Sequence, residues 1–298
     1  MINALDTAGV NGKTINDAQA MVNGQLIVDV VIIRARDGYR DDQFYAVHRD
    51  AVKKATNPSG AALWGTYAYL GYTAKAGAYS WTAQRGDVQA QDYWNLISAG
   101  GIEWQVPPAL DTENLVYWEK RENPDGTSKL VRQTVPMPEV HQYADTYLMP
   151  ATKFLADKAG RLPLQYLNAD KILNYLSPLK QESKYDLLFQ CPLWLADWNA
   201  LVNGMPSYWT KVQKYFPNLI MHQYKGDVRD WPGVSDVDLN RIPGTRKQLK
   251  AWLADKTAPL PSEGGSDPID PPPVVVPEGV EARVKEIEDK LAAIKAIL

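Results

Sequence analysis

The 298-residue sequence contains a single cysteine, Cys191, and only three histidines. One cysteine excludes an intrachain disulfide framework, and so few cysteines and histidines argue against a structural zinc cluster. No apolar run reaches the roughly 18 residues of a membrane-spanning helix, so we expect no transmembrane segment and no membrane partner. The start, MINALDTAGVNG, has neither the basic region nor the apolar stretch of a secretory signal peptide, and we expect none.

Charge and aromatic content narrow the function classes further. The 32 basic and 35 acidic residues are dispersed along the chain, which argues against a nucleic-acid partner. An apolar fraction of 45% and a charged fraction of 22% are typical of a globular protein and exclude global disorder. Ten tryptophans and sixteen tyrosines stand against four phenylalanines. This ratio suits either the binding of sugar rings or a core rich in hydrogen-bonded aromatic side chains.

The composition divides the chain into three parts, which are 1–256, 257–279 and 280–298. The middle part has seven prolines in 23 residues, a density typical of a semi-rigid extended linker. The last part carries apolar residues with heptad spacing, namely Val280, Val284, Ile287, Leu291, Ile294 and Leu298. This spacing predicts an amphipathic helix that joins copies of the chain in a short coiled coil. The alternative is a helix that packs back onto the first part.

The first 256 residues alternate between apolar strands and helix-compatible stretches. The predicted strands are 28–35, 62–70, 106–112, 162–167, 191–197 and 218–224, with short ones at 3–6 and 236–240. The helix-compatible stretches include 41–56, 85–99, 139–158 and 204–215. Continuous apolar strands separated by helices indicate a parallel sheet that is covered on its outer side. We therefore predict an α/β fold, an irregular (β/α) TIM-like barrel whose last units are too short for full helices.

Several predicted strands end in acidic residues, which are Asp6, Asp111 with Glu113, and Asp197, and the last predicted strand carries Asp238. In a barrel, the side chains at the carboxyl ends of the strands line the active site. Asp111 and Glu113 would project to the same face of a strand, roughly 6–7 Å apart. Carboxyl groups this close raise one pKa, which gives a protonated acid beside an ionised carboxylate. Glycoside hydrolysis uses such a pair, one group to protonate the leaving oxygen and one to stabilise positive charge at the sugar.

The chain resembles glycoside hydrolase family 25, the N-acetylmuramidase lysozymes that cut bacterial cell walls, including bacteriophage endolysins. The matching segments span residues 5–240 and occur in the order of the family. They are Leu5–Gly12, Val31–Gly38, Gly65–Tyr69, Ala109–Glu113, Leu164–Tyr166, Leu193–Trp198, His222–Tyr224 and Val237–Asn240. Each segment alone is a loose match, and their common order is what makes the resemblance specific.

The resemblance implies an irregular barrel of about five βα units with further strands that close it. It implies that Glu113 is the general acid and that Asp6, Asp111 and Asp238 complete an acidic cluster. The substrate would be bacterial peptidoglycan, cut at the β-1,4 bond between N-acetylmuramic acid and N-acetylglucosamine without metal or organic cofactor. Two routes stay open: Asp111 orients an attacking N-acetyl group of the substrate, or Asp6 or Asp238 activates water in an inverting reaction.

Other residues at strand ends are candidates for binding the substrate. Tyr69, Tyr166 and Trp198 are either platforms for sugar rings or ordinary packing residues. Gln223 is a further candidate. Asp197 either contacts the substrate or accepts hydrogen bonds from neighbouring backbone groups.

The sequence departs from the family pattern at three positions. Ala8 and Asn11 stand where the family usually has Ser and Gln, and Asp37 stands where it often has Glu. None of these departures removes one of the four carboxylates. They therefore bear on substrate contacts, and activity is still expected.

The segment 114–138 belongs to this chain more than to the family pattern. The turn signal Asn-Pro-Asp-Gly at 123–126 separates two strand-like arms. We predict a β-hairpin that rises from the active-site face directly after the catalytic strand. It would form one wall of the substrate groove, with Tyr117, Trp118 and Arg121 as contacts.

The biological setting follows from the resemblance together with the expected absence of a signal peptide. A wall-degrading enzyme without a signal peptide points to an endolysin, made in the host cytoplasm and released to the wall through a separate holin. Several catalytic domains on one coiled coil would raise the effective concentration at the wall. Two alternatives stay open. One is a non-catalytic glycan-binding or virion-associated module, and the other is a glycosidase for chitin or for the other peptidoglycan linkage.

Overall fold

The computed structural model describes most of the first part of the chain. The described residues are 2–7, 21–22, 25–26, 28–37, 40–54, 56–57, 60–61, 63–70, 73–75, 78–80, 85–112, 116–122, 128–134, 137–199, 205–228 and 237–254. All of them fall within one compact unit, Met1–Glu263. The predicted linker 257–279 and helix 280–298 lie outside the described residues. So do Glu113, Ala8 and Asn11.

Eight strands of the nine-stranded main sheet close into a barrel, because β1 pairs with β4 as well as with β17. The barrel strands are β1 (Ile2–Thr7), β4 (Val30–Asp37), β8 (Leu63–Tyr69), β11 (Ala109–Asp111), β14 (Leu164–Asn168), β15 (Leu193–Ala196), β16 (Leu219–Val228) and β17 (Val237–Ile242). Neighbours from β1 to β16 run parallel, whereas β17 is antiparallel to both β16 and β1. The predicted irregular barrel is confirmed. The reversed last strand brings its first residues to the edge where the parallel strands end.

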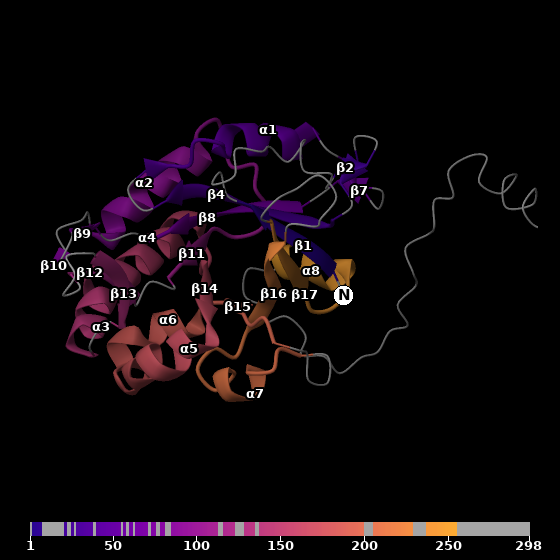
Figure 1. Ribbon diagram of the computed structural model, residues 1–298. Coiled ribbons are helices and arrows are strands. Elements are labelled where there is room, and N and C mark those ends of the chain that lie inside the picture. The colour runs from indigo at the N-terminus through magenta and orange to yellow at the C-terminus, as the bar shows by residue number, and fades with distance from the viewer. Residues whose placement is uncertain are drawn as a thin grey trace, which may run out of the picture. The chain divides into compact units, whose positions relative to one another are not determined.

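Helices connect the parallel strands and cover the outside of the barrel. They are α1 (Tyr45–Lys54), α2 (Gly86–Ser98), α3 (Met137–Tyr143), α4 (Met149–Ala159), α5 (Ala169–Lys171), α6 (Asp186–Gln190) and α7 (Trp209–Val212). A further helix, α8 (Arg246–Ala254), follows β17, and its Leu249 and Trp252 pack into the apolar cluster inside the barrel. Figure 1 shows α1 and α2 lying over β4 and β8. The stretch 204–215, expected to be helical, forms only the four-residue helix α7. This agrees with the expectation that the last units are too short for full helices.

The burial of β4 explains why the barrel strands are continuously apolar in sequence. Val31 and Ile33 belong to the apolar cluster that also contains residues of the outer helices, while Val30 and Ile32 belong to a second cluster inside the barrel. Successive side chains of a strand point to opposite faces, and here both faces are buried. A polar side chain on an inward position is therefore an exception, and such exceptions gather at one end of the barrel.

Smaller sheets complete the fold. The predicted hairpin is confirmed: β12 (Val116–Glu122) and β13 (Ser128–Thr134) pair antiparallel along their whole length. The other short strands are β2 (Met21–Val22), β3 (Gln25–Leu26), β5 (Arg40–Asp41), β6 (Thr56–Asn57), β7 (Gly60–Ala61), β9 (Thr73–Lys75) and β10 (Ala78–Ser80). Within the part of the chain that the structure describes, no helix is both long and apolar enough to cross a membrane.

Candidate active site

Two acidic residues face each other where β1 ends and β17 begins. Asp6 and Asp238 are directly paired in the antiparallel register of these strands. Asn240 donates from Nδ2 to Asp6 Oδ2 at 2.6 Å and to the Asp238 carbonyl oxygen at 3.2 Å. Asp6 is buried, and Asp238 is partly exposed. The reversal of the last strand is thus what brings two carboxylates from opposite ends of the sequence to one edge.

Gln223 of β16 bridges these two carboxylates. Its Nε2 donates to Asp6 Oδ2 at 3.3 Å and to Asp238 Oδ2 at 3.1 Å. Its Oε1 accepts from the Tyr166 hydroxyl at 2.8 Å and from Trp198 Nε1 at 3.0 Å. Only an amide offers donors on one atom and an acceptor on the other, so a carboxylate or an apolar side chain would break this network. The residue is 1% exposed.

Asp111 is a third acidic residue at this edge. It is the last residue of β11 and lies in register with Tyr69 of β8 and Tyr166 of β14. Its backbone is fixed, since the Leu70 amide donates to its carbonyl oxygen at 3.0 Å. Asp111 is nearly buried. The predicted general acid Glu113 lies two residues further on, outside the described residues.

Tyr67, two positions before Tyr69 and therefore on the same face of β8, is a site residue that the sequence analysis did not single out. It is buried, and burial raises the pKa of its hydroxyl well above the ordinary value. The negative charges of Asp6, Asp111 and Asp238 raise this pKa further. The hydroxyl therefore lies within electrostatic reach of all three carboxylates and stays protonated as a hydrogen-bond donor. Strand alternation over 65–69 was the signal that could have identified it.

Arg34 is a second residue that the sequence analysis did not single out. It lies in register with Tyr67 on the neighbouring strand β4, and its Nε donates to Asp42 Oδ2 at 2.8 Å. Burial alone would lower the pKa of its guanidinium, but Tyr67, Asp42 and Asp37 outweigh this and raise it. A permanent positive charge thus stands beside the acidic cluster. Asp37 lies 3.9 Å from Arg34, close enough for an ion pair, and its side chain is mostly exposed.

Trp194 forms the floor beneath these polar groups. Its ring packs edge-on against Tyr166 and Tyr67, with centroid distances of 4.7 and 5.9 Å. Its Nε1 donates to Asn240 Oδ1 at 2.7 Å. Asn240 in turn holds Asp6, so the apolar interior of the barrel and the acidic cluster are joined by one continuous set of contacts.

Asp197 is placed differently from the other predicted acids. It follows Ala196, whose side chain lies in the inner cluster, so strand alternation turns Asp197 outward. Its Oδ1 accepts from the backbone and side-chain nitrogens of Asn199 at 3.3 and 2.7 Å. Its Oδ2 accepts from Ser207 Oγ at 2.9 Å and from the Tyr208 amide at 3.0 Å. Burial would raise its pKa, but these hydrogen bonds lower it below the ordinary value. The geometry supports the second of its two predicted roles, an acceptor for neighbouring groups.

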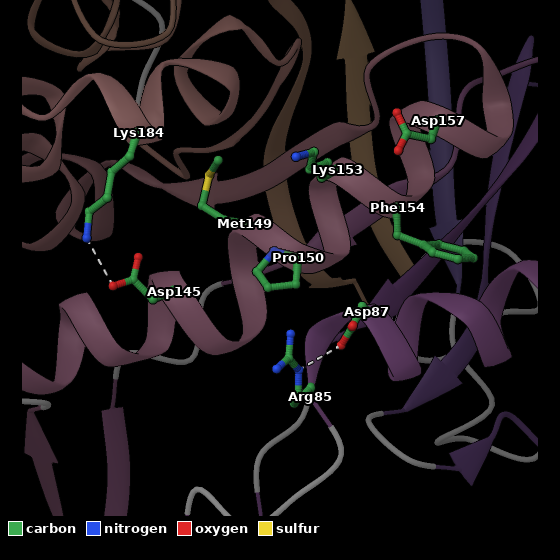
Figure 2. A pocket seen from close by; sticks show the side chains of 9 residues that line it. All are labelled: Arg85, Asp87, Asp145, Met149, Pro150, Lys153, Phe154, Asp157 and Lys184. Atoms are coloured by element: carbon green, nitrogen blue, oxygen red, sulfur yellow. Dashed lines mark hydrogen bonds and ion pairs between the residues drawn. The ribbon is translucent and has the colours of Figure 1, made fainter.

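A surface groove on the helical layer is separate from this site. It has a volume of about 480 Å³ and is lined by residues of α2, α4 and their surroundings, as Figure 2 shows. Lys184 is paired there with Asp145 at 3.0 Å and Arg85 with Asp87 at 3.2 Å. None of the carboxylates of the barrel edge lines this groove. Among the described residues, no group of histidine, cysteine and acidic side chains is arranged to hold a metal ion.

Comparison with known proteins bears on the fold. No protein-family model matches the sequence, and no curated protein matches it. Solved structures do match. A muramidase from Trichobolus zukalii has a TM-score of 0.54 at 18% identity, over 85% of this chain and 99% of that chain. A family GH25 lysozyme from Aspergillus fumigatus has a TM-score of 0.52 at 19% identity, over 85% and 99%. A family 25 glycosyl hydrolase from Bacillus anthracis has a TM-score of 0.52 at 15% identity, over 84% and 93%. The resemblance seen in the sequence is therefore confirmed at the level of the fold, which this chain shares with family 25 lysozymes and muramidases.

Proposed function

We propose that the chain is a peptidoglycan hydrolase that cleaves the β-1,4 bond between N-acetylmuramic acid and N-acetylglucosamine. The observation that carries the proposal is the carboxylate cluster at the barrel edge. Asp6 and Asp238 are bridged by one amide, and Tyr67 interacts with both and with Asp111. An acidic cluster at the carboxyl edge of a barrel, beside buried aromatic rings, suits a cationic sugar-like transition state.

In this proposal Glu113 protonates the leaving oxygen, and the other carboxylates stabilise the positive charge that develops at the sugar. Asp111, fixed at the end of its strand, orients the N-acetyl group of the substrate if that group attacks. The neutral hydroxyl of Tyr67 then serves as a hydrogen-bond donor, since its raised pKa prevents it from acting as a base. In the inverting alternative, Asp6 or Asp238 activates water instead.

The test is digestion of purified peptidoglycan by the wild type and by Glu113→Gln. New reducing ends are reduced with borohydride, and the modified sugar is identified. We expect muramitol from the wild type and none from the variant, while Asp87→Asn, which changes an acid of the helical groove, behaves as the wild type. Glucosaminitol would instead assign the cut to the other linkage. Binding without new ends would favour the glycan-binding module.

The predicted hairpin wall is tested on the same substrates. We propose that β12 and β13 contact long glycan strands, because they follow the strand that carries Asp111. Deletion of 119–132 is expected to impair cleavage of polymeric peptidoglycan while leaving the fold intact. Unchanged polymer cleavage would contradict this role.

We further propose that residues 280–298 join copies of the chain and that 257–279 is their linker to the barrel. The heptad spacing of the apolar residues supports this proposal. Light scattering on the full chain is expected to give an oligomer, and Ile287→Asp is expected to give a monomer. A role as an endolysin, made in the host cytoplasm, predicts that expression in a sensitive bacterium causes lysis only when a holin is co-expressed.

A further inference from the structure

Two exposed aromatic side chains stand at the edge of the barrel mouth. Trp198 is 61% exposed and Tyr208 is 38% exposed, whereas Trp64, Trp194 and Trp252 are nearly buried. Large exposed apolar side chains that lie close together mark binding surfaces more often than isolated ones do. The segments of Trp198 and Tyr208 lie close together because Asp197, which directly precedes Trp198, binds the Tyr208 amide through its carboxylate.

Trp198 is held along the edge of its indole that carries Nε1 and Cζ2. Its Nε1 donates to Gln223 at 3.0 Å, so its polar atom is directed toward the acidic cluster. Gly226 of β16 lies against the six-membered ring, where a Cβ atom would clash with Trp198 Cζ2. A residue other than glycine at 226 would therefore displace the indole. Glycine at 226 therefore leaves room for the indole of Trp198 in this position. The part of the indole that stays exposed is apolar.

Tyr208 is held through its backbone. Its amide donates to Asp197 at 3.0 Å, and the ammonium group of Lys211 lies 5.1 Å from its ring centroid. Tyr208 is connected to the segment of Trp198 by way of Asp197, whereas Trp198 reaches the acidic cluster through Gln223.

We infer that Trp198 and Tyr208 form a platform that binds a sugar ring of the glycan strand beyond the two rings at the scissile bond. Aromatic faces suit the apolar faces of sugar rings, and this platform continues directly from the acidic cluster. The inference rests on the proposed function for the identity of the strand. Asp197 is a positioning residue in this platform, since it contacts the two aromatic segments and acts through them.

The test uses the full chain carrying Glu113→Gln, with purified peptidoglycan glycan strands of two, four and six sugars as probes. Binding is measured by calorimetry and by tryptophan fluorescence. Tyr208→Ala is expected to weaken binding of the longer strands about tenfold and to leave the disaccharide unchanged. Tyr208→Trp keeps a ring and is expected to retain the binding. Ile102→Ala removes an exposed apolar side chain before β11, at the opposite end of the barrel, and is expected to change nothing.

Two further variants address the positioning. Gly226→Ala is expected to shift the fluorescence of Trp198 and to weaken binding of the longer strands. In the otherwise wild-type enzyme, Asp197→Asn is expected to raise KM for long strands several-fold with little change in kcat. A merely structural role would instead lower kcat and thermal stability together.

The outcomes separate this inference from the proposed function. If the wild type cleaves peptidoglycan but Tyr208→Ala binds all strands normally, the platform is refuted and the enzyme stands. If the wild type does not cleave but binds the strands in a length-dependent way that Tyr208→Ala abolishes, the platform stands and the enzyme is refuted. Absence of binding to any strand would overturn the platform.

Discussion

Replacement of Gln223 by glutamate tests the bridge between the two carboxylates with almost no change in shape. In the wild type, Gln223 Nε2 donates to Asp6 and Asp238 at 3.3 and 3.1 Å. In Gln223→Glu, a third carboxyl group takes the place of this amide. If it were ionised, repulsion would amount to roughly 5 kcal/mol for each of the two pairs at an effective dielectric constant of about 20. Protonating a glutamic acid at pH 7 costs only about 3.7 kcal/mol, from its ordinary pKa of about 4.3. The introduced carboxyl group is therefore expected to be protonated in the folded variant.

The sign of the pH dependence follows from this raised pKa. The penalty is absent below the unfolded pKa of about 4.3 and grows as the pH rises toward the folded pKa. We expect the free energy of unfolding of Gln223→Glu to lie about 5–6 kcal/mol below that of the wild type at pH 7, where the protonation cost adds to the lost hydrogen bonding, and about 1–2 kcal/mol below it at pH 4, where only lost hydrogen bonding remains.

Denaturant unfolding at several pH values measures this difference, together with kcat. The introduced carboxyl group, when protonated, has one donor for two carboxylates, so kcat is expected to fall by about 10- to 100-fold. The matched control is Gln248→Glu, a half-buried glutamine that accepts from the Thr245 amide at the start of α8, where a carboxylate serves equally well. If Gln223→Glu matched the wild type in stability between pH 5 and 8, the bridge would be refuted.

Three further predictions follow from single side chains. Tyr67→Phe removes the hydroxyl near the three carboxylates but keeps the ring packed on Trp194. We therefore expect kcat to fall about 10- to 100-fold, with KM and melting temperature nearly unchanged. A fall in melting temperature along with kcat would indicate a packing role instead. Burial lowers the pKa of His222 below 6.5, and hydrogen bonds lower that of Asp197 below 3.8, so both groups stabilise the fold fully above pH 6.5. That stability is lost as the pH falls, first through the titration of His222, and His222→Gln is expected to flatten the unfolding profile below pH 6.5. Burial raises the pKa of Cys191 to about 12, so the thiol is expected to react with Ellman's reagent at pH 8 only after unfolding; rapid reaction of the folded protein would contradict its burial.

The strands of the barrel were predictable because each is buried on both faces. Alternate residues of β4 enter two different apolar clusters, and this double burial leaves a continuous apolar run in the sequence. The hairpin was predictable for another reason, since the Asn-Pro-Asp-Gly turn signal at 123–126 separates two strand-like arms in the sequence. The reversed direction of β17 was not predictable, because the alternation of apolar and polar residues in VDLNRI marks a strand without marking its direction.

The site was predictable only in part. A polar side chain that points into the barrel is distinguished from a packing side chain by the residues it contacts, and these lie on other strands. Asp6, Asp111 and Asp238 stand at strand ends, where an acidic residue is conspicuous in the sequence. Tyr67 lies inside an apolar run, where strand alternation places it on the same face as Tyr69 but does not show that its hydroxyl lies near carboxylates. Its role depends on charges contributed by three other strands. These carboxylates come close to Tyr67 only when the barrel closes, and the local sequence around Tyr67 does not show this.

The contrast between Asp197 and Asp6 gives a physical criterion for separating structural from functional acids in this barrel. Both are buried acids at the carboxyl end of an apolar strand. The carboxylate of Asp197 accepts from residues 2, 10 and 11 positions later in the chain, so it organises its own connecting segment. Asp6 accepts from Gln223 and Asn240, which lie 217 and 234 positions away on two other strands. A carboxylate oriented by other strands depends on the whole barrel for its position. Replacing Asn240 should therefore change catalysis, while replacing Asn199 should change only the segment that carries Trp198.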